Sequence, residues 1–123
     1  MSIKRLPDSE LAVMQAVWAC TPPVSRIDIE QQLHDAYPIA QTTLLTLLSR
    51  LTDKGFLSAD KAGRGKTYTA TISQQEYLAQ QSRSFFEKLC GSSMSAFATA
   101  LCDSGISKED LQELRKLLEE DDL

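Results

Sequence analysis

The stretch that decides the fold covers residues 40–70 and reads AQTTLLTLLSRLTDKGFLSADKAGRGKTYTA. Its first half has leucines spaced at i, i+3, i+4 and i+7: Leu44, Leu47, Leu48 and Leu51. This spacing forms one apolar stripe, which is typical of an amphipathic helix packed on a core. We therefore predict a helix from about Ala40 to Lys54, ended by Gly55 in the left-handed conformation.

The second half of the stretch, from Phe56 onwards, has a period of two. The alternating apolar residues are Leu57 and Ala59 on one arm and Tyr68, Ala70 and Ile72 on the other. Between the arms lies the segment 62–66, which contains two glycines and two basic residues. Alternation on both sides of such a turn predicts a β-hairpin with a basic tip.

The remaining helices are predicted from a repeated start pattern. An apolar residue is followed by a cap, an acidic residue three positions after the cap, and a second apolar residue. The caps in this pattern are Pro7, Ser25, Ser73 and Ser107. They predict helices at about 8–20, 26–36, 74–90 and 108–120, and we expect a short further helix near Met94 to Cys102.

Composition places the chain among ordinary globular proteins of about one domain, with 123 residues, 42% hydrophobic and 24% charged. Three cysteines, Cys20, Cys90 and Cys102, lack the spacing of a metal site or a disulfide scaffold, so we expect small buried hydrophobes in a reducing cytoplasm. Residues 1–11 have no apolar leader segment, and no uncharged run reaches the roughly 18 residues of a membrane span. A soluble cytoplasmic protein is expected.

The formal net charge of -4 hides an uneven distribution. Residues 1–73 have eight basic and seven acidic side chains, whereas residues 74–123 have five basic and ten acidic ones. Five basic residues lie in the predicted third helix and hairpin: Arg50, Lys54, Lys61, Arg64 and Lys66. Their local field favours a phosphate backbone, because an acidic tail beyond about 8–10 Å is largely screened. The alternative is that these charges only keep the hairpin soluble.

The outward face of the third helix favours DNA. If the four leucines pack inward, the face left outside consists of Thr42, Leu45, Thr46, Ser49, Arg50 and Asp53. Short polar side chains suit a helix in the major groove. We predict that Thr42, Leu45 and Thr46 read bases. The predicted phosphate contacts are Gln41, Thr43, Ser49, Arg50, Lys54, Arg64 and Lys66.

Three helices followed by a basic hairpin define the winged helix-turn-helix variant. The predicted fold class is therefore mainly α with a small β-hairpin. A winged-helix DNA-binding domain is expected over residues 1–73 and a helical dimerisation region over 74–123. The alternative function is a winged-helix protein-protein interaction module in a larger assembly. Leu45 favours that alternative, although a protein-docking helix is expected to present exposed aromatic anchors.

The last fifty residues contain more apolar surface than three short helices can bury among themselves, which predicts a second copy of the chain as partner. The expected dimerisation residues are Tyr77, Phe85, Phe86, Leu89, Phe97, Leu111, Leu114, Leu117 and Leu118. Nothing predicts an enzyme, a cofactor or a metal site. The one histidine, His34, has no second ligand at i+4, and the segment 63–66 lacks the length and following helix of a phosphate loop.

Three segments together resemble the penicillinase-repressor family, which includes the methicillin-resistance and copper-responsive repressors of bacteria. They are ELAVMQAVW at 10–18, TLLTLLSRLTDKGFL at 43–57 and DLQELRKLL at 110–118. The resemblance implies a homodimeric winged-helix transcriptional repressor on a palindromic operator. Some members are inactivated by proteolysis, so a membrane-bound sensor protease is a candidate partner.

The chain departs from the family pattern at three places. Leu45 stands where members often have a long polar or basic residue, so their operator sequence cannot be carried over. Thr99 and Ala100 stand where the β-lactam-responsive members have a scissile Asn-Phe pair. The chain ends Glu119 to Leu123 where copper-responsive members have a four-cysteine tail. We therefore expect neither cleavage at 99–100 nor copper sensing through the tail.

Overall fold

The computed structural model describes residues 3–120. The described residues form, in order, α1 (Asp8–Ala19), β1 (Val24–Ser25), α2 (Arg26–Ala36), α3 (Gln41–Asp53), β2 (Leu57–Ala62), β3 (Gly65–Ala70), α4 (Gln74–Lys88), α5 (Met94–Asp103) and α6 (Lys108–Glu120). The chain divides into two compact units, Met1–Gln81 and Ser82–Leu123. This division falls inside α4, C-terminal to the expected boundary after residue 73. Residues 1–2 and the tail residues 121–123 lie outside the described part.

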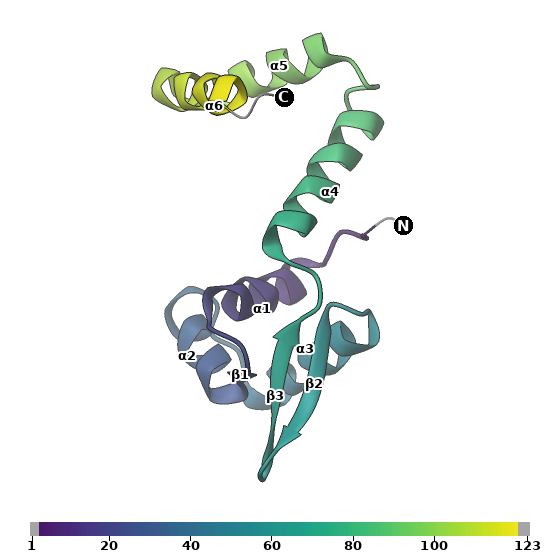
Figure 1. Cartoon of the computed structure of the whole chain (residues 1–123), viewed down its shortest axis with the longest axis vertical. Helices are drawn as coiled ribbons and strands as arrows, with labels where there is room; N and C mark the ends of the chain where they lie inside the picture. The colour runs from purple at the N-terminus through teal and green to yellow at the C-terminus, as the bar shows by residue number, and fades with distance from the viewer. Residues whose placement is uncertain (1–2, 121–123) are drawn as a thin grey trace. The chain divides into compact units, whose positions relative to one another are not determined.

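The core of the first unit lies where α1, α2 and α3 pack together beside a small sheet (Figure 1). The predicted apolar stripe of α3 is confirmed, since all four of its leucines are buried. They pack with Met14 of α1 and Ile29 of α2 in one cluster. Gly55 ends the α3 turn with a φ of 82°, as predicted from the left-handed preference of glycine.

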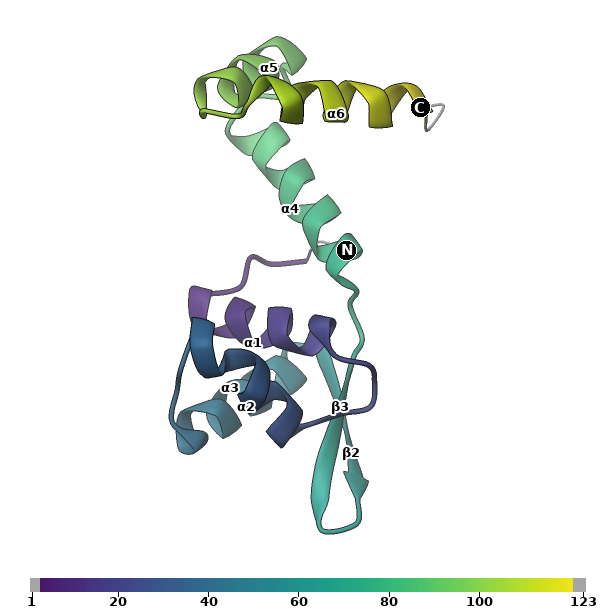
Figure 2. The same cartoon turned by 90° about the vertical axis from the view of Figure 1, so that its left-hand side faces the viewer.

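The predicted hairpin is confirmed as β2 and β3, which pair antiparallel with Leu57 opposite Ala70 and Ala62 opposite Gly65. Its second arm ends at Ala70, so the expectation that the strand includes Ile72 is wrong. Figure 2 shows the hairpin extending away from the three helices of this unit. The sheet also has a third strand, β1, whose Val24 pairs with Tyr68 of β3. Strand β1 has two residues, too few to show an alternating pattern.

The predicted serine caps are confirmed. The hydroxyls of Ser25, Ser73 and Ser107 accept hydrogen bonds from backbone N–H groups three residues later, at 3.1, 3.0 and 3.1 Å. At Ser73 the Glu76 carboxylate accepts the backbone N–H in return, at 2.9 Å, which completes a capping box. The hydrogen bonds from Ser73, from its backbone first, lower the pKa of the Glu76 carboxyl. Pro7 offers no side-chain cap to α1.

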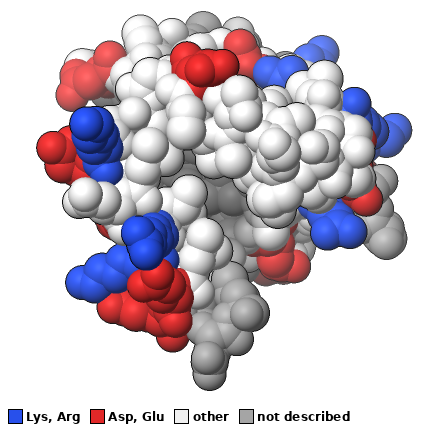
Figure 3. Space-filling model, turned by 90° about the horizontal axis from the view of Figure 1, so that it is seen from above, with Lys and Arg blue, Asp and Glu red and all other residues white. Residues whose placement is uncertain are grey.

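The second unit contains the end of α4 with α5 and α6. Its aromatic contacts centre on Phe97, whose ring centroid lies 6.0 Å from that of Phe85 and 5.9 Å from that of Phe86. No side chain of α5 or α6 is fully buried among the described residues. Figure 3 shows a wide uncharged area on the face that carries these two helices, with charged side chains at its margins. No helix in residues 3–120 is long and apolar enough to cross a membrane.

Candidate nucleic-acid interface

Helix α3 presents a continuous exposed face on the side opposite its leucine stripe. Thr42, Leu45, Thr46, Ser49 and Arg50 are all exposed, as the helical wheel predicts. Leu45 keeps 43% of its surface in solvent, an unusual state for a leucine in a helix that buries four others. The Thr46 hydroxyl donates to the Thr42 carbonyl at 3.0 Å, so its oxygen and methyl group remain available to a ligand.

This face of α3 and the hairpin, from its middle to its tip, line one open hollow of about 620 Å³. Its lining includes four predicted DNA contacts, namely Leu45, Ser49, Arg64 and Lys66. Arg26, at the start of α2, lines the same hollow and was missed by the sequence analysis. Its position depends on the pairing of Val24 with Tyr68, which no local pattern predicts. The Arg26 guanidinium pairs with the Glu30 carboxylate.

The hairpin concentrates positive charge at its tip. Lys61 of β2 lies directly opposite Lys66 of β3, and Arg64 is exposed in the turn between them. Like charges at directly opposed positions repel each other and destabilise a hairpin, so an anion bound between them relieves this repulsion. Lys61 therefore joins the candidate phosphate contacts, although the sequence analysis did not select it. The register that brings Lys61 and Lys66 together was the missing signal.

The remaining predicted phosphate contacts lie at the two ends of α3. Gln41 and Thr43 are exposed in the first turn, where Ala40 provides no side-chain cap, so backbone N–H groups there remain open to an anion. Lys54 lies at the other end, and its ammonium group pairs with the Glu10 carboxylate of α1. The Glu10 residue is 3% exposed. This ion pair ties the C-terminus of α3 to α1 and competes with a phosphate for Lys54.

The ion pair predicts a large stability effect at a position chosen for DNA contact. Lys54→Ala leaves the buried Glu10 carboxylate without its partner, so we expect a loss of about 2 kcal/mol in the free energy of unfolding at neutral pH. Adding Glu10→Gln to the Lys54→Ala variant should restore most of the lost stability. Urea unfolding measures the effect, with Arg50→Ala, which removes an exposed cation of the same helix, as the control. An unchanged midpoint for Lys54→Ala would contradict this role.

The expected dimerisation residues occupy two environments. Tyr77 is buried in the first unit, where its hydroxyl accepts a hydrogen bond from the Leu6 backbone N–H at 2.8 Å. Its surface is therefore used within the chain. Phe86, Phe97 and Leu111 are half-buried. The expected dimerisation residues that remain exposed are Phe85, Leu89, Leu114, Leu117 and Leu118.

Other residues considered for chemistry are scattered. His34 is exposed, and its ring nitrogen Nδ1 lies 3.1 Å from the neighbouring Asp35 carboxylate. Residues 3–120 contain no His, Cys, Asp or Glu group suited to a metal ion. Burial, then the Asp28 charge, raise the pKa of the Cys20 thiol, which favours its protonated form. Cys20 and Cys90 are half-buried and Cys102 is exposed, so the expectation of buried cysteines is wrong for Cys102 and is met only in part by the other two.

A three-helix unit with an exposed polar face on its third helix and a cationic hairpin beside it defines a winged helix-turn-helix protein. The family model of the penicillinase repressor matches residues 6–120. The chain belongs to the penicillinase repressor family, and the resemblance seen in the sequence is confirmed.

Two relatives and one solved structure illustrate the similarity. An uncharacterised 16.5 kDa protein in the ptsI 3′ region of Latilactobacillus sakei is 38% identical over 113 residues, which cover 89% of this chain and 75% of the relative. The penicillinase repressor of Bacillus licheniformis is 28% identical over 119 residues, covering 96% and 92% respectively. The solution structure of monomeric B. licheniformis BlaI with the blaP half-operator matches with a TM-score of 0.51 and 30% identity, covering 62% of this chain and 92% of that one.

Proposed function

We propose that this chain is a homodimeric transcriptional repressor that binds a palindromic operator. The observation that carries this proposal is the convergence of the polar α3 face and the cationic hairpin on one open hollow. Membership of the penicillinase repressor family supports it, as does the similarity to a protein solved with a half-operator. The chain then acts in the cytoplasm and is not an enzyme.

The roles of individual residues follow from their positions. Helix α3 enters the major groove with Thr42, Leu45 and Thr46 towards base edges. The phosphate contacts come from α3 and the hairpin: Gln41, Thr43, Ser49, Arg50, Lys54, Arg64 and Lys66. Arg26 and Lys61 are added because the fold places them beside these residues. The exposed apolar side chains of the second unit contact a second copy, whose two-fold axis matches the operator dyad.

Selection from random duplexes tests the proposal directly. The full chain is expected to enrich an inverted repeat and to bind it at least about a thousandfold more tightly than random DNA. Fluorescence anisotropy at several salt concentrations measures both affinities. Failure to enrich any sequence, together with capture of a protein by the α3 face, would favour the interaction module instead.

The exposed Leu45 predicts a contact with a thymine methyl group. If Leu45 packs on that methyl, replacing one thymine per half-site by uracil should weaken binding by about 1 kcal/mol per contact, since one buried methyl group is lost. In the Leu45→Ala variant the same replacement should have no effect. Anisotropy on the selected operator measures this double comparison. An equal loss in both proteins would exclude Leu45 as the reader of the methyl.

Cleavage between Thr99 and Ala100 is not expected to release this repressor. Both residues lie inside α5, where the Thr99 hydroxyl donates to the Ser95 carbonyl at 2.9 Å, so a protease must first open the helix. In a protease whose pocket selects phenylalanine, Ala100 would also leave that pocket largely empty, which lowers the cleavage rate by a factor on the order of a hundred.

Mass spectrometry of the chain in its native host, treated with a β-lactam, measures this prediction. We expect this bond to stay uncut, so that the intact mass of the chain persists. The variant with Thr99→Asn and Ala100→Phe provides the matched control, and it should be cut if a sensor protease is present. Wild-type fragments ending at Thr99 would overturn the prediction. Fragments cut at another bond would mean that proteolysis releases the repressor at a different site.

A further inference from the structure

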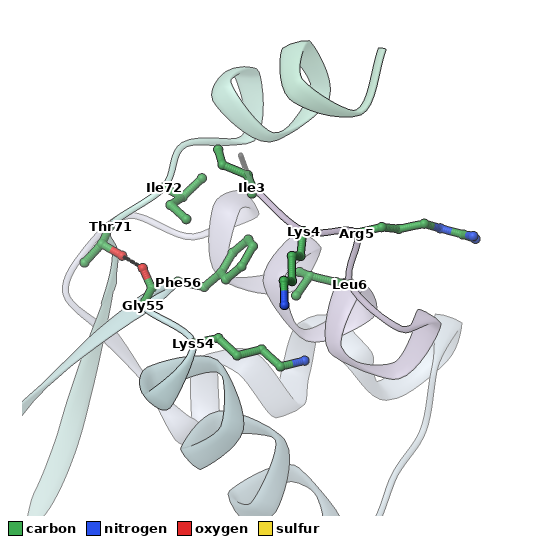
Figure 4. Close-up of a pocket in the computed structure, with 9 residues that line it drawn as sticks. All are labelled: Ile3, Lys4, Arg5, Leu6, Lys54, Gly55, Phe56, Thr71 and Ile72. Carbon is green, nitrogen blue, oxygen red and sulfur yellow. Dashed lines mark hydrogen bonds between the residues drawn. The ribbon is translucent and has the colours of Figure 1, made fainter. Parts of the chain in front are cut away.

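A second hollow in the first unit shares no lining residue with the one beside α3 and the hairpin. It lies between the N-terminal segment, the turn that follows α3, and the residues that follow β3 (Figure 4). Its volume is about 730 Å³. That volume falls within the roughly 300–1,000 Å³ of pockets that hold small molecules.

The lining combines an apolar wall with a cationic end. Leu6 and Phe56 are 2% and 4% exposed, and Ile72 is half-buried beside them. Figure 4 shows Lys4 and Lys54 directing their nitrogen atoms to the same side of the pocket, whereas the Arg5 side chain extends outward. This arrangement suits a molecule with an apolar body and one anionic group.

The charged side chains at the pocket favour a ligand with a single negative charge. The Lys54 ammonium is already shared with the buried Glu10 carboxylate. Lys4 is exposed and forms no ion pair within the described residues. A ligand carboxylate between the two lysines completes a cluster of two positive and two negative charges, in which the Lys54 ammonium is shared between the ligand and Glu10. A phosphate dianion would add a second negative charge beside the Glu10 carboxylate.

The pocket lies at the base of both DNA-binding elements. Lys54 is the C-cap of α3, and Phe56 immediately precedes β2. Thr71 follows β3, and its backbone N–H donates to the Phe56 carbonyl at 2.9 Å. A ligand carboxylate bound to Lys54 occupies the ammonium group that we assign to a DNA phosphate, so the ligand and DNA compete for it. Because linkage is reciprocal, each then weakens the binding of the other.

We propose that this pocket is an effector site for a small carboxylate with an apolar body, and that its occupancy weakens DNA binding. The second part rests on the proposed repressor function. The first part does not, since it concerns only the pocket and its ligand.

The probe is cyclohexylacetate, with 2-cyclohexylethanol as the neutral match, added to the isotope-labelled full chain. Trp18 is the one tryptophan, and its indole N–H donates to the Ile72 carbonyl of the pocket at 2.9 Å. Its indole signal and the amide signals of Thr71 and Ile72 are expected to shift and saturate. The carboxylate should bind about tenfold more tightly than the alcohol, because it gains a charge-assisted hydrogen bond.

Two variants locate the site. Lys4→Gln should weaken cyclohexylacetate binding by about five- to tenfold. Lys116→Gln, which removes an exposed lysine of α6, should leave it unchanged. Equal affinity for the acid and the alcohol, an unaffected Lys4→Gln variant, or shifts confined to α5 and α6 would each overturn the site.

Operator anisotropy with and without saturating cyclohexylacetate tests the coupling. A severalfold loss of DNA affinity is expected in the wild type and a smaller loss in Lys4→Gln. Binding of the probe with unchanged DNA affinity would overturn the effector role, but it would still support the pocket as a binding site for the carboxylate. A chain that binds the probe but enriches no operator would instead overturn the proposed function.

Discussion

A chain carrying Leu114→Asp together with Leu117→Asp is expected to sediment as a monomer at micromolar concentration and to lose at least about a hundredfold in operator affinity. The two side chains are 38% and 51% exposed on α6, although they belong to its apolar face. In a symmetric dimer each substitution occurs twice, and each leucine contributes about 0.6–1.5 kcal/mol through the part of its surface that a partner can still cover. Four such losses, together with the cost of burying four carboxylates in an apolar contact, exceed the roughly 8 kcal/mol that holds a micromolar dimer.

The control places two acids on the polar side of the same helix, and it lowers the charge by three rather than two because one acid replaces a lysine. Gln112→Asp with Lys116→Asp also adds two acids to α6, at positions on the opposite face, and this variant should remain dimeric. Circular dichroism checks that both variants keep their helices. A wild-type chain that sediments as a monomer at micromolar concentration would contradict the dimer itself.

The elements that the sequence predicts well are those encoded by local interactions. Helix α2 begins at Arg26 because the Ser25 hydroxyl and the Asp28 carboxylate satisfy backbone N–H groups within one turn. The leucine stripe of α3 likewise depends only on spacing within one helix. The sequence therefore predicts α2, α3 and the hairpin to within a few residues, and with them most of the α3 face.

The features that the sequence does not predict depend on distant pairs. Glu10 and Lys54 are separated by 44 residues and meet only when α1 packs on the end of α3. Arg26 reaches the hollow beside α3 through the pairing of β1 with β3. Tyr77 lies in the first turn of α4, but its hydroxyl accepts a hydrogen bond from the backbone N–H of Leu6, 71 residues away. Periodicity within one element carries no information about these contacts.

The apolar face of α6 shows a different limit. A stripe of leucines indicates that a face is buried without naming what covers it. Within one chain Leu117 and Leu118 each keep 51% of their surface exposed, and a second copy is our proposal for their cover. The dimerisation residues therefore stay predictions, whereas the four leucines of the α3 stripe pack inside the first unit.

Substitutions in the hairpin and on α3 should separate affinity from specificity. Arg64→Ala with Lys66→Ala removes two cations from each hairpin, and it should weaken operator and random DNA alike. The slope of log affinity against log salt should fall by about two per half-site, because each lost phosphate contact releases about one counterion fewer. Salt-titrated anisotropy on both kinds of DNA measures this loss.

Thr46→Ala is expected to act on the operator alone, with a cost of about 1–3 kcal/mol per half-site and no change in the salt slope, because a base contact exchanges no counterion. Thr46→Val identifies the group that is used, since valine keeps the methyl group and loses the hydroxyl. Retained affinity in Thr46→Val would assign the contact to the methyl group, and lost affinity would assign it to the hydroxyl, whose proton already binds the Thr42 carbonyl in the free protein. If Thr46→Ala instead lowers the affinity for random DNA as much as for the operator, Thr46 holds the phosphate backbone and the base-reading face of α3 must be assigned to Thr42 and Leu45.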